Sequence, residues 1–221
     1  MNVLMASVSG FVLGCLHAFD ADHLTAVTVF ASRSRSRMAA IKFGVVWGLG
    51  HTTTLFLLGV ATAAFKFVIP PAVQTGSELF VGLLLIAIGI WALSPVRVGK
   101  KIRIHRHEHD GVEHAHVVSD EEGGSRFHHH SMFAVGAAHG FAGTAAVMVI
   151  VPLTIAESLI AVVAYLILFG LGTIVAMSIF ALTVGTLSVE AEKRGLVPYL
   201  RKFAGGTSIV VGCIWIALVL R

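Results

Sequence analysis

The chain has 221 residues, of which 56% are hydrophobic and only 13% are charged, and its mean hydropathy is +0.87. Soluble domains carry about 25% charged residues, so this composition excludes an ordinary soluble protein and predicts an integral protein of the lipid bilayer. The net charge of +4 would suggest nucleic acid as the partner of a soluble chain. Basic cytoplasmic loops explain it here, and we expect no nucleic-acid partner.

Six hydrophobic segments approach the roughly 20 apolar residues that one helical crossing needs. They span residues 3–31, 38–65, 76–94, 131–152, 155–187 and 203–220. A long polar interval at residues 95–130 holds eight of the twelve histidines, and we expect a largely flexible loop there. The predicted fold is therefore an all-α integral membrane protein with six transmembrane helices.

Lysine and arginine concentrate on alternate loops of this arrangement. Of the 16 basic residues, 14 lie in or beside the first, third and fifth loops, while Lys66 and Arg221 lie on the opposite side. Because cytoplasmic loops are enriched in these residues, we expect a multi-pass protein of the cytoplasmic membrane. Both termini should lie outside, and residues 95–130 should form a histidine-rich cytoplasmic loop.

The two halves of the chain resemble each other at a shift of 122 residues. This comparison predicts three-helix repeats at residues 1–94 and 131–221. Because each repeat holds an odd number of crossings, the second would be inverted relative to the first, as in many secondary transporters. Chance similarity between glycine-rich helices is the alternative. The matching positions are Phe11, Gly14, His17 and Phe19 with Phe133, Gly136, His139 and Phe141, and Gly48-Leu-Gly50 with Gly170-Leu-Gly172.

Four ionisable side chains interrupt the first hydrophobic segment: His17, Asp20, Asp22 and His23. An Asp at the centre of a membrane helix costs roughly 2.5–3.5 kcal/mol, so such a group indicates a functional site. Imidazoles mixed with carboxylates suit nickel, cobalt or zinc better than calcium or copper(I). On a continuous helix His17, Asp20 and His23 form one stripe, and Asp22 lies about 140° from His17. Asp22 would then support a ligand or pair with another helix, unless the helix unwinds. The alternative is that these groups only lock helices together.

Two further histidines lie within hydrophobic segments. His51 follows Gly48-Leu-Gly50, where small residues permit close helix approach, and it serves either packing or ligation. His139 is the repeat counterpart of His17, but its half lacks both acids, so it either completes the site or bonds to Thr144. The predicted metal-binding residues are therefore His17, Asp20, Asp22, His23, His51 and His139.

These residues carry a family resemblance. The run His17-Ala-Phe-Asp-Ala-Asp22-His23 resembles the H-x4-D-H signature of the nickel/cobalt permeases, and Leu49-Gly-His51-Thr-Thr is similar to their second marker. The chain looks like the short six-helix, urease-accessory type. The resemblance implies transport of Ni(II) or Co(II), with His17, Asp22 and His23 carrying selectivity, and a link to the maturation of nickel enzymes such as urease. Uptake is the expected direction. The histidine-rich segment is more like that of related exporters, which makes export the alternative.

Other classes of function lack their motifs in this sequence. We expect no enzyme, since no H-E-x-x-H metalloprotease motif occurs, and no phosphate-binding loop that would indicate ATP. The metal is thus expected as a transported substrate and not as a cofactor. A thiol-redox membrane protein would need paired cysteines, but the repeat counterpart of Cys15 is Ala137, and Cys213 lies in the last segment. The histidine-rich segment has three possible roles: part of the transport path, a metal buffer at the inner mouth, or a solvated loop of no consequence. Its spacing is irregular, so we expect many weak metal sites and no single preorganised one.

Overall fold

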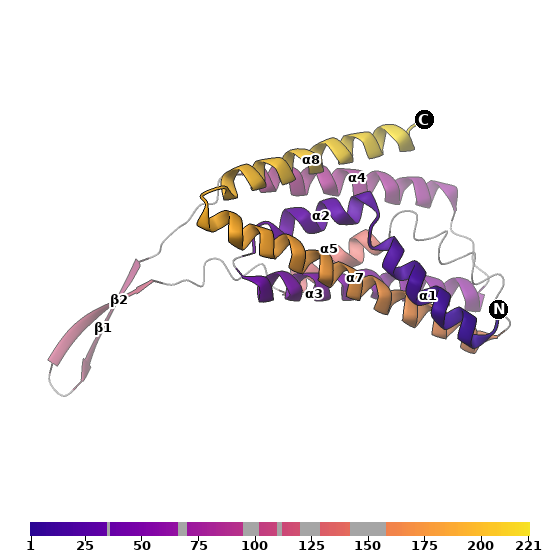
Figure 1. Cartoon of the computed structure of the whole chain (residues 1–221), viewed down its shortest axis with the longest axis horizontal. Helices are drawn as coiled ribbons and strands as arrows, with labels where there is room; N and C mark the ends of the chain where they lie inside the picture. Colours follow the sequence, from indigo (N-terminus) through magenta and orange to yellow (C-terminus); the bar gives the residue numbers. More distant parts are fainter. Residues whose placement is uncertain (35, 66–69, 95–101, 110–111, 120–128, 142–157) are drawn as a thin grey trace.

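The structure is a computed structural model that describes residues 1–34, 36–65, 70–94, 102–109, 112–119, 129–141 and 158–221. Strands β1 (Ile102–His109) and β2 (Val112–Ser119) form an antiparallel hairpin, and the other elements are helices (Figure 1). The helices are α1 (Val3–His17), α2 (Ala21–Ala31), α3 (Arg37–Phe65), α4 (Pro71–Leu93), α5 (His129–Gly140), α7 (Leu159–Lys193) and α8 (Val197–Val219).

The helical part has the composition of a multi-pass membrane protein. Within the described residues, α3, α4, α7 and α8 are long and apolar enough to cross a membrane, and the bent pair α1 and α2 is a fifth candidate. Helices α4 and α8 begin earlier than predicted, with prolines in their first turns, where a proline needs no hydrogen-bond donor. The fourth predicted segment appears as α5 up to Gly140, and its remainder lies outside the described residues. Six crossings therefore remain a prediction.

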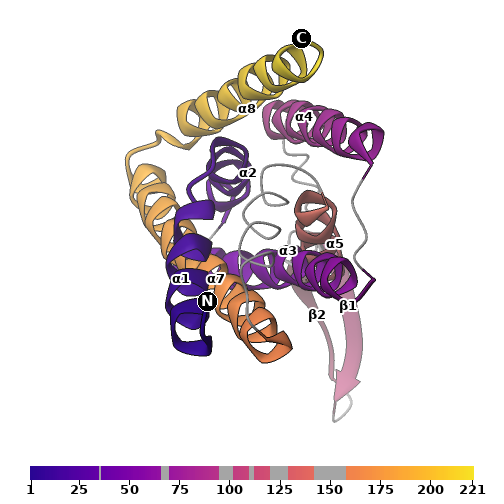
Figure 2. The same ribbon diagram turned by 90° about the vertical axis from the view of Figure 1, so that its right-hand side faces the viewer.

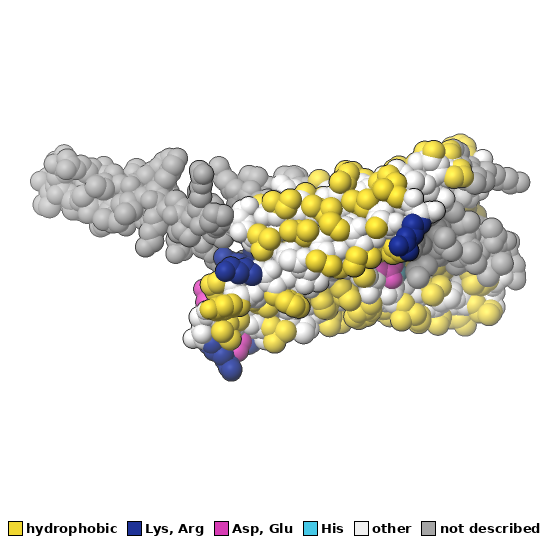
Figure 3. Space-filling model, turned by 90° about the horizontal axis from the view of Figure 1, so that it is seen from above, with side chains coloured by type: hydrophobic (Ala, Val, Ile, Leu, Met, Phe, Trp, Pro, Cys, Tyr) yellow, Lys and Arg dark blue, Asp and Glu magenta, His cyan; other side chains and the backbone are white. Residues whose placement is uncertain are grey.

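The helices pack in two groups that α2 connects (Figure 2). Helix α7 lies against α1 and α3, α3 also packs on α5, and α4 packs on α8, while α2 contacts α4, α7 and α8. The interior between them is filled by buried side chains such as Phe43, Trp47, Leu85 and Met177. Hydrophobic side chains cover much of the face seen in Figure 3, and Lys and Arg side chains gather towards its ends. This distribution suits a surface embedded in lipid.

Glycines bring pairs of helices into backbone contact, and the contacts recur at the shift seen in the sequence. A Cβ on Gly14 would meet the carbonyl of Phe169, and a Cβ on Gly136 would meet the carbonyl of Trp47. Gly136 lies 122 positions after Gly14, and Phe169 lies 122 positions after Trp47. Such approaches exclude any side chain. Two further pairs of contacts are related in this way. The contact of Gly172 with Phe11 matches that of Gly50 with Phe133 at a shift of 122 residues. The contact of Gly82 with Gly212 matches that of Gly205 with Gly89 at a shift of 123.

The hairpin occupies part of the segment that was expected as a largely flexible loop. The register runs from Ile102 opposite Ser119 to His109 opposite Val112. Isoleucine and valine favour strands, and the sequence between β1 and β2 is Asp-Gly, a preferred dipeptide of two-residue hairpin turns. The hairpin extends from the end of the helical bundle that lies opposite both termini (Figure 1).

We expect the substitution Gly172→Ala to destabilise the protein, because its Cβ would press on the backbone of Phe11 and Cys15. Overpacking of this kind costs about 1–3 kcal/mol. Gly206 of α8 is the matched control, since a Cβ there meets nothing within 4 Å and alanine favours a helix by about 1 kcal/mol. The melting temperature of the detergent-purified variants should fall for Gly172→Ala and stay level or rise for Gly206→Ala. Equal melting temperatures would contradict this role of glycine.

Candidate metal centre

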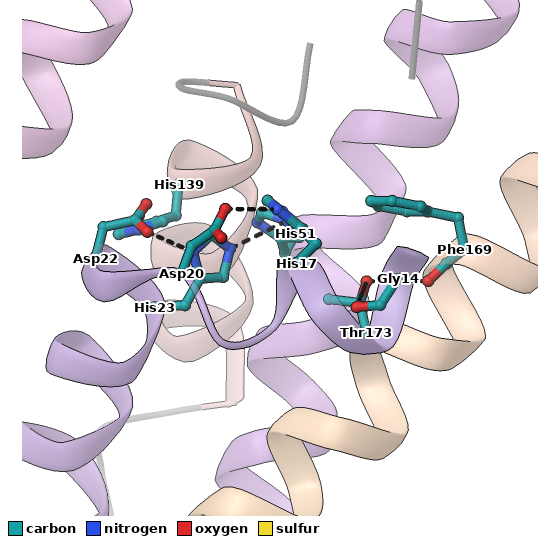
Figure 4. Close-up of polar contacts among 9 residues, drawn as sticks. All are labelled: Gly14, His17, Asp20, Asp22, His23, His51, His139, Phe169 and Thr173. Atoms are coloured by element: carbon teal, nitrogen blue, oxygen red, sulfur yellow. Dashed lines mark hydrogen bonds and ion pairs between the residues drawn. The ribbon is translucent and has the colours of Figure 1, made fainter. Parts of the chain in front are cut away.

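The site is built around a break in the first transmembrane segment. Helix α1 ends at His17, and α2 starts at Ala21 after a bend of 62°. Asp20 is the N-cap residue of α2, with extended backbone angles (φ −60°, ψ 145°). Of the alternatives left open by the sequence, the structure has the unwound helix, so His17, Asp20 and His23 do not form one stripe on a continuous helix. The break turns α2 so that Asp22 and His23 both join the cluster (Figure 4).

A hydroxyl from α7 supports the end of α1. Thr173 Oγ1 lies within hydrogen-bond distance of the carbonyl oxygens of Gly14 (3.1 Å) and Phe169 (2.9 Å). The carbonyl of Gly14 also accepts the N–H of the C-cap residue Ala18 (3.2 Å), so the Thr173 hydroxyl is a second donor, from another helix, at the point where α1 ends. Thr173 is fully buried, where an unpaired hydroxyl or carbonyl would be costly.

Three histidine nitrogens converge behind the break. His51 Nε2, from α3, lies 3.0 Å from His17 Nε2 and 3.4 Å from His23 Nε2. The three side chains are at most 2% exposed. Nitrogens bound to one ion at about 2.0–2.1 Å lie roughly 2.9–3.4 Å apart in octahedral or tetrahedral geometry. The observed spacing therefore suits three imidazole ligands of a single divalent ion.

Two of these imidazoles, those of His17 and His23, are hydrogen-bonded to a carboxylate through Nδ1, the ring nitrogen that faces away from the convergence (Figure 4). His17 Nδ1 donates to Asp20 Oδ2 (2.9 Å), and His23 Nδ1 donates to Asp22 Oδ1 (2.8 Å). A neutral imidazole that donates from Nδ1 presents its lone pair on Nε2, which is the form that binds a metal ion. Within the described residues, His51 Nδ1 has no hydrogen-bond partner.

His139 of α5 reaches the cluster through a carboxylate. Its Nε2 donates to Asp22 Oδ2 at 2.9 Å, so Asp22 lies between His139 and His23. The alternative partner of His139, Thr144, lies outside the described residues. Asp22 and His139 are at most 4% exposed, whereas the Asp20 side chain is 28% exposed. All six predicted residues thus lie in one connected group, and Asp20 is its most accessible member.

Aromatic rings that the sequence analysis missed enclose this group. The ring of Phe169 lies 5.4 Å from that of His17, and the ring of Trp47 lies 5.3 Å from that of His139. The shift of 122 residues that relates His17 to His139 also relates Trp47 to Phe169. The internal repeat therefore contained a signal that could have identified both rings.

The arrangement can hold a desolvated divalent cation. Two carboxylates offset the charge of such an ion, and neutral imidazoles supply nitrogen ligands. Nitrogen and oxygen donors of this kind suit nickel, cobalt and zinc. The fold and this buried group together define a multi-pass membrane protein with an intramembrane cluster of histidine and aspartate.

Comparison with known proteins agrees with this class. The family model described as cytochrome c biogenesis protein transmembrane region matches residues 24–214, and the chain belongs to this family of membrane proteins. It is similar to the urease accessory protein UreH of Bacillus sp. (strain TB-90), with 30% identity over 213 residues, which cover 96% of this chain and 90% of that protein.

More distant relatives have other names. Chloroplast protein FOR GROWTH AND FERTILITY 2 of Arabidopsis thaliana is 27% identical over 220 residues, and this chain spans 57% of its length. A Methanocaldococcus jannaschii protein, provisionally named as a nickel/cobalt efflux system, is 28% identical over 109 residues, 48% of each chain. No solved structure matches the chain. UreH and the efflux system support a nickel/cobalt permease-like family, and these relatives are accessory or transport proteins and not enzymes.

We expect Asp22→Ala to destabilise the metal-free protein more than Asp20→Ala does. Loss of Asp22 leaves His23 Nδ1 and His139 Nε2 buried without their acceptor, and an orphaned buried polar group costs about 1–3 kcal/mol. The side chain of Asp20 is 28% exposed, so water can replace it on His17. Melting temperatures measured with a chelator present would test the order, and a larger loss for Asp20→Ala would contradict it.

Proposed function

We propose that this protein is a secondary transporter that moves Ni(II) or Co(II) across the cytoplasmic membrane, in the direction of uptake. The observation that carries the proposal is the convergence of the buried Nε2 atoms of His17, His23 and His51. The names of two relatives, a urease accessory protein and a nickel/cobalt efflux system, support this class of substrate. A role in supplying nickel for urease maturation fits the first of these names.

The six residues have different roles in this proposal. His17, His23 and His51 are the nitrogen ligands, near the membrane midplane. Asp20 and Asp22 orient two of these ligands and offset the charge of the ion, as carboxylates behind metal-bound histidines do. His139 holds Asp22 from α5, and so ties the ligands of α2 to the second half of the chain.

Two inverted three-helix repeats, residues 1–94 and 131–221, would provide alternating access by rocking against each other around this site. The recurrence of the glycine contacts at a shift of 122 residues supports this arrangement. Residues 95–130 would face the cytoplasm and both termini the outside, which agrees with the charge distribution. The chain has no G-x-x-x-x-G-K-[ST] motif, so the driving force would come from an ion gradient or the membrane potential.

Export is the second candidate, and the name of the Methanocaldococcus jannaschii relative favours it. The ligand cluster serves either direction equally well, because a carrier binds the same ion on both paths. Metal content of cells with and without the gene, measured for nickel, cobalt and zinc together, separates the two: an importer raises it and an exporter lowers it.

We expect His51→Ala to abolish nickel and cobalt uptake while the protein still inserts into the membrane. His51 Nε2 contributes to both short nitrogen contacts of the cluster, so its loss leaves only two histidine ligands. Ser208→Ala is the matched control, because Ser208 is also fully buried but donates to Leu85 O at 2.7 Å, away from the cluster. Radioactive nickel uptake should fall to background only in His51→Ala, and normal uptake by a well-inserted His51→Ala protein would overturn the site.

We also expect collapse of the membrane potential to slow uptake. Inward movement of a doubly charged ion gains about 4.6 kcal/mol per 100 mV if the carrier adds no charge of its own. Proteoliposomes with a nickel-sensing dye inside should show faster filling at an imposed negative potential than without one. Uptake that depends on ATP and ignores the potential would refute a secondary mechanism.

A further inference from the structure

Three helices meet at the end of the bundle that lies opposite both termini: α2 and α4 end there, and α8 begins there (Figure 1). Their buried residues Val29, Ala92 and Ala204 belong to one cluster. Arg33 follows Val29 by four positions, and Arg201 precedes Ala204 by three. Each arginine therefore lies about one helical turn beyond this buried contact, at the same end of the bundle.

Contacts with α4 fix the guanidinium of Arg33. Its Nη2 donates to the carbonyl oxygens of Ala92 (3.1 Å) and Ser94 (3.3 Å). Its central carbon lies 3.9 Å from the centre of the Trp91 ring, which is within the range of a cation–π contact. Within the described residues, Nε of Arg33 is buried and has no hydrogen-bond partner. The guanidinium is thus held in place with one donor unused.

Arg201 brings a second positive charge to the same place. It shares a face of α8 with Gly205, four positions later, and a Cβ on Gly205 would lie 3.0 Å from the side chain of Leu93 on α4. Arg201 is therefore on the side of α8 that faces α4. Its Nε is also buried without a hydrogen-bond partner, and neither arginine forms an ion pair with a carboxylate of the described residues.

This pair of arginines favours an anion. Burial lowers the pKa of the Arg33 guanidinium, and the charge of Arg201 lowers it further, so the two charges are close enough to repel each other. Arginine stays charged in proteins, and a buried donor without an acceptor is costly. An anion between the two side chains would relieve the repulsion and accept from both Nε donors.

We propose that Arg33 and Arg201 together bind the phosphate group of an anionic phospholipid. A phosphate has several acceptor oxygens, and its geometry matches the planar fork of a guanidinium. The site lies at the ends of membrane-crossing helices, which is the depth of lipid headgroups, and basic pockets between such helices bind anionic headgroups. Leu93 beside the pair is exposed, so apolar surface for an acyl chain is adjacent. The bound phosphate would tie α2 and α4 to α8.

The test uses full-length protein in detergent, depleted of lipid, and measures the rise in melting temperature on adding a ligand. The ligands are short-chain phosphatidylglycerol, which has a net negative charge, short-chain phosphatidylcholine, which has none, and inorganic phosphate. A ligand that binds only the folded state stabilises it. We therefore expect phosphatidylglycerol to raise the melting temperature, and phosphatidylcholine to raise it much less.

Arg201→Gln is the informative substitution, because Arg201 makes no hydrogen bond to the described residues that its loss would break. Without lipid, its melting temperature should equal or exceed that of the unchanged protein, since repulsion on Arg33 is relieved. With phosphatidylglycerol, most of the rise should be lost. Lys202→Gln is the matched control: it removes the same charge from the neighbouring, exposed position and should keep the full rise. Arg201→Lys keeps the charge without the fork and should recover part of it.

The outcomes are distinct. An equal rise with phosphatidylglycerol in Arg201→Gln and in the unchanged protein would overturn the proposal, and so would an equal rise with phosphatidylcholine. A rise with inorganic phosphate alone that Arg201→Gln loses would support the arginine pair as a phosphate site and overturn the lipid as its ligand. The inference does not rest on the proposed transport function, because no residue of the histidine and aspartate cluster takes part.

Discussion

Ionisable groups persist in the interior of a membrane protein only where each one finds a partner, and this constraint shapes the centre of the molecule. A buried carboxylate without a partner costs several kcal/mol. Asp22 avoids that cost by accepting hydrogen bonds from His23 on α2 and His139 on α5. The bond from His139, at 2.9 Å, joins α5 to α2, and the break between α1 and α2 is a condition for this geometry. A straight helix would place Asp22 away from His17.

Close helix approach follows from the same requirement. Gly14 precedes His17 by three positions, and Gly136 precedes His139 by three, so each of these histidines lies about one turn from a backbone contact. Gly50 and Gly172 directly precede the buried residues His51 and Thr173, and they too touch the backbone of a neighbouring helix. The polar centre can form because side chains that would hold the helices apart are absent beside it. Glycine packing and the histidine cluster are thus one structural feature.

Much of this could be predicted from the sequence, and the failures have physical causes. Composition was sufficient for the membrane class. The cost of buried charge drew attention to His17, Asp20, Asp22 and His23, and the internal repeat and the glycines of the second segment added His51 and His139. The sequence left an unwound helix open as one alternative and could not decide for it, because Ala18, Phe19 and Asp20 contain no proline or glycine and the supporting hydroxyl of Thr173 lies 159 residues from Gly14 along the chain. The hairpin was missed although its signals are local, namely residues that favour strands on either side of an Asp-Gly dipeptide. Contact between distant parts of the chain determines the helix break, and a local pattern does not contain that contact.

The two halves contribute unequally to the centre, and this asymmetry has a mechanical consequence. The first half supplies the three converging imidazoles and both carboxylates, whereas the second half supports them, through His139 on Asp22 and Thr173 on the carbonyl of Gly14. Thr173 lies 122 positions after His51, so at matching positions the first half has an imidazole of the cluster and the second half has a hydroxyl that donates to the end of α1. If the halves rock as proposed, relative motion must act on the two supporting contacts before it reaches the ligands. Movement of the second half would then change the positions of the ligands in the first half through these two contacts. It would not act directly on the nitrogen atoms that face the ion.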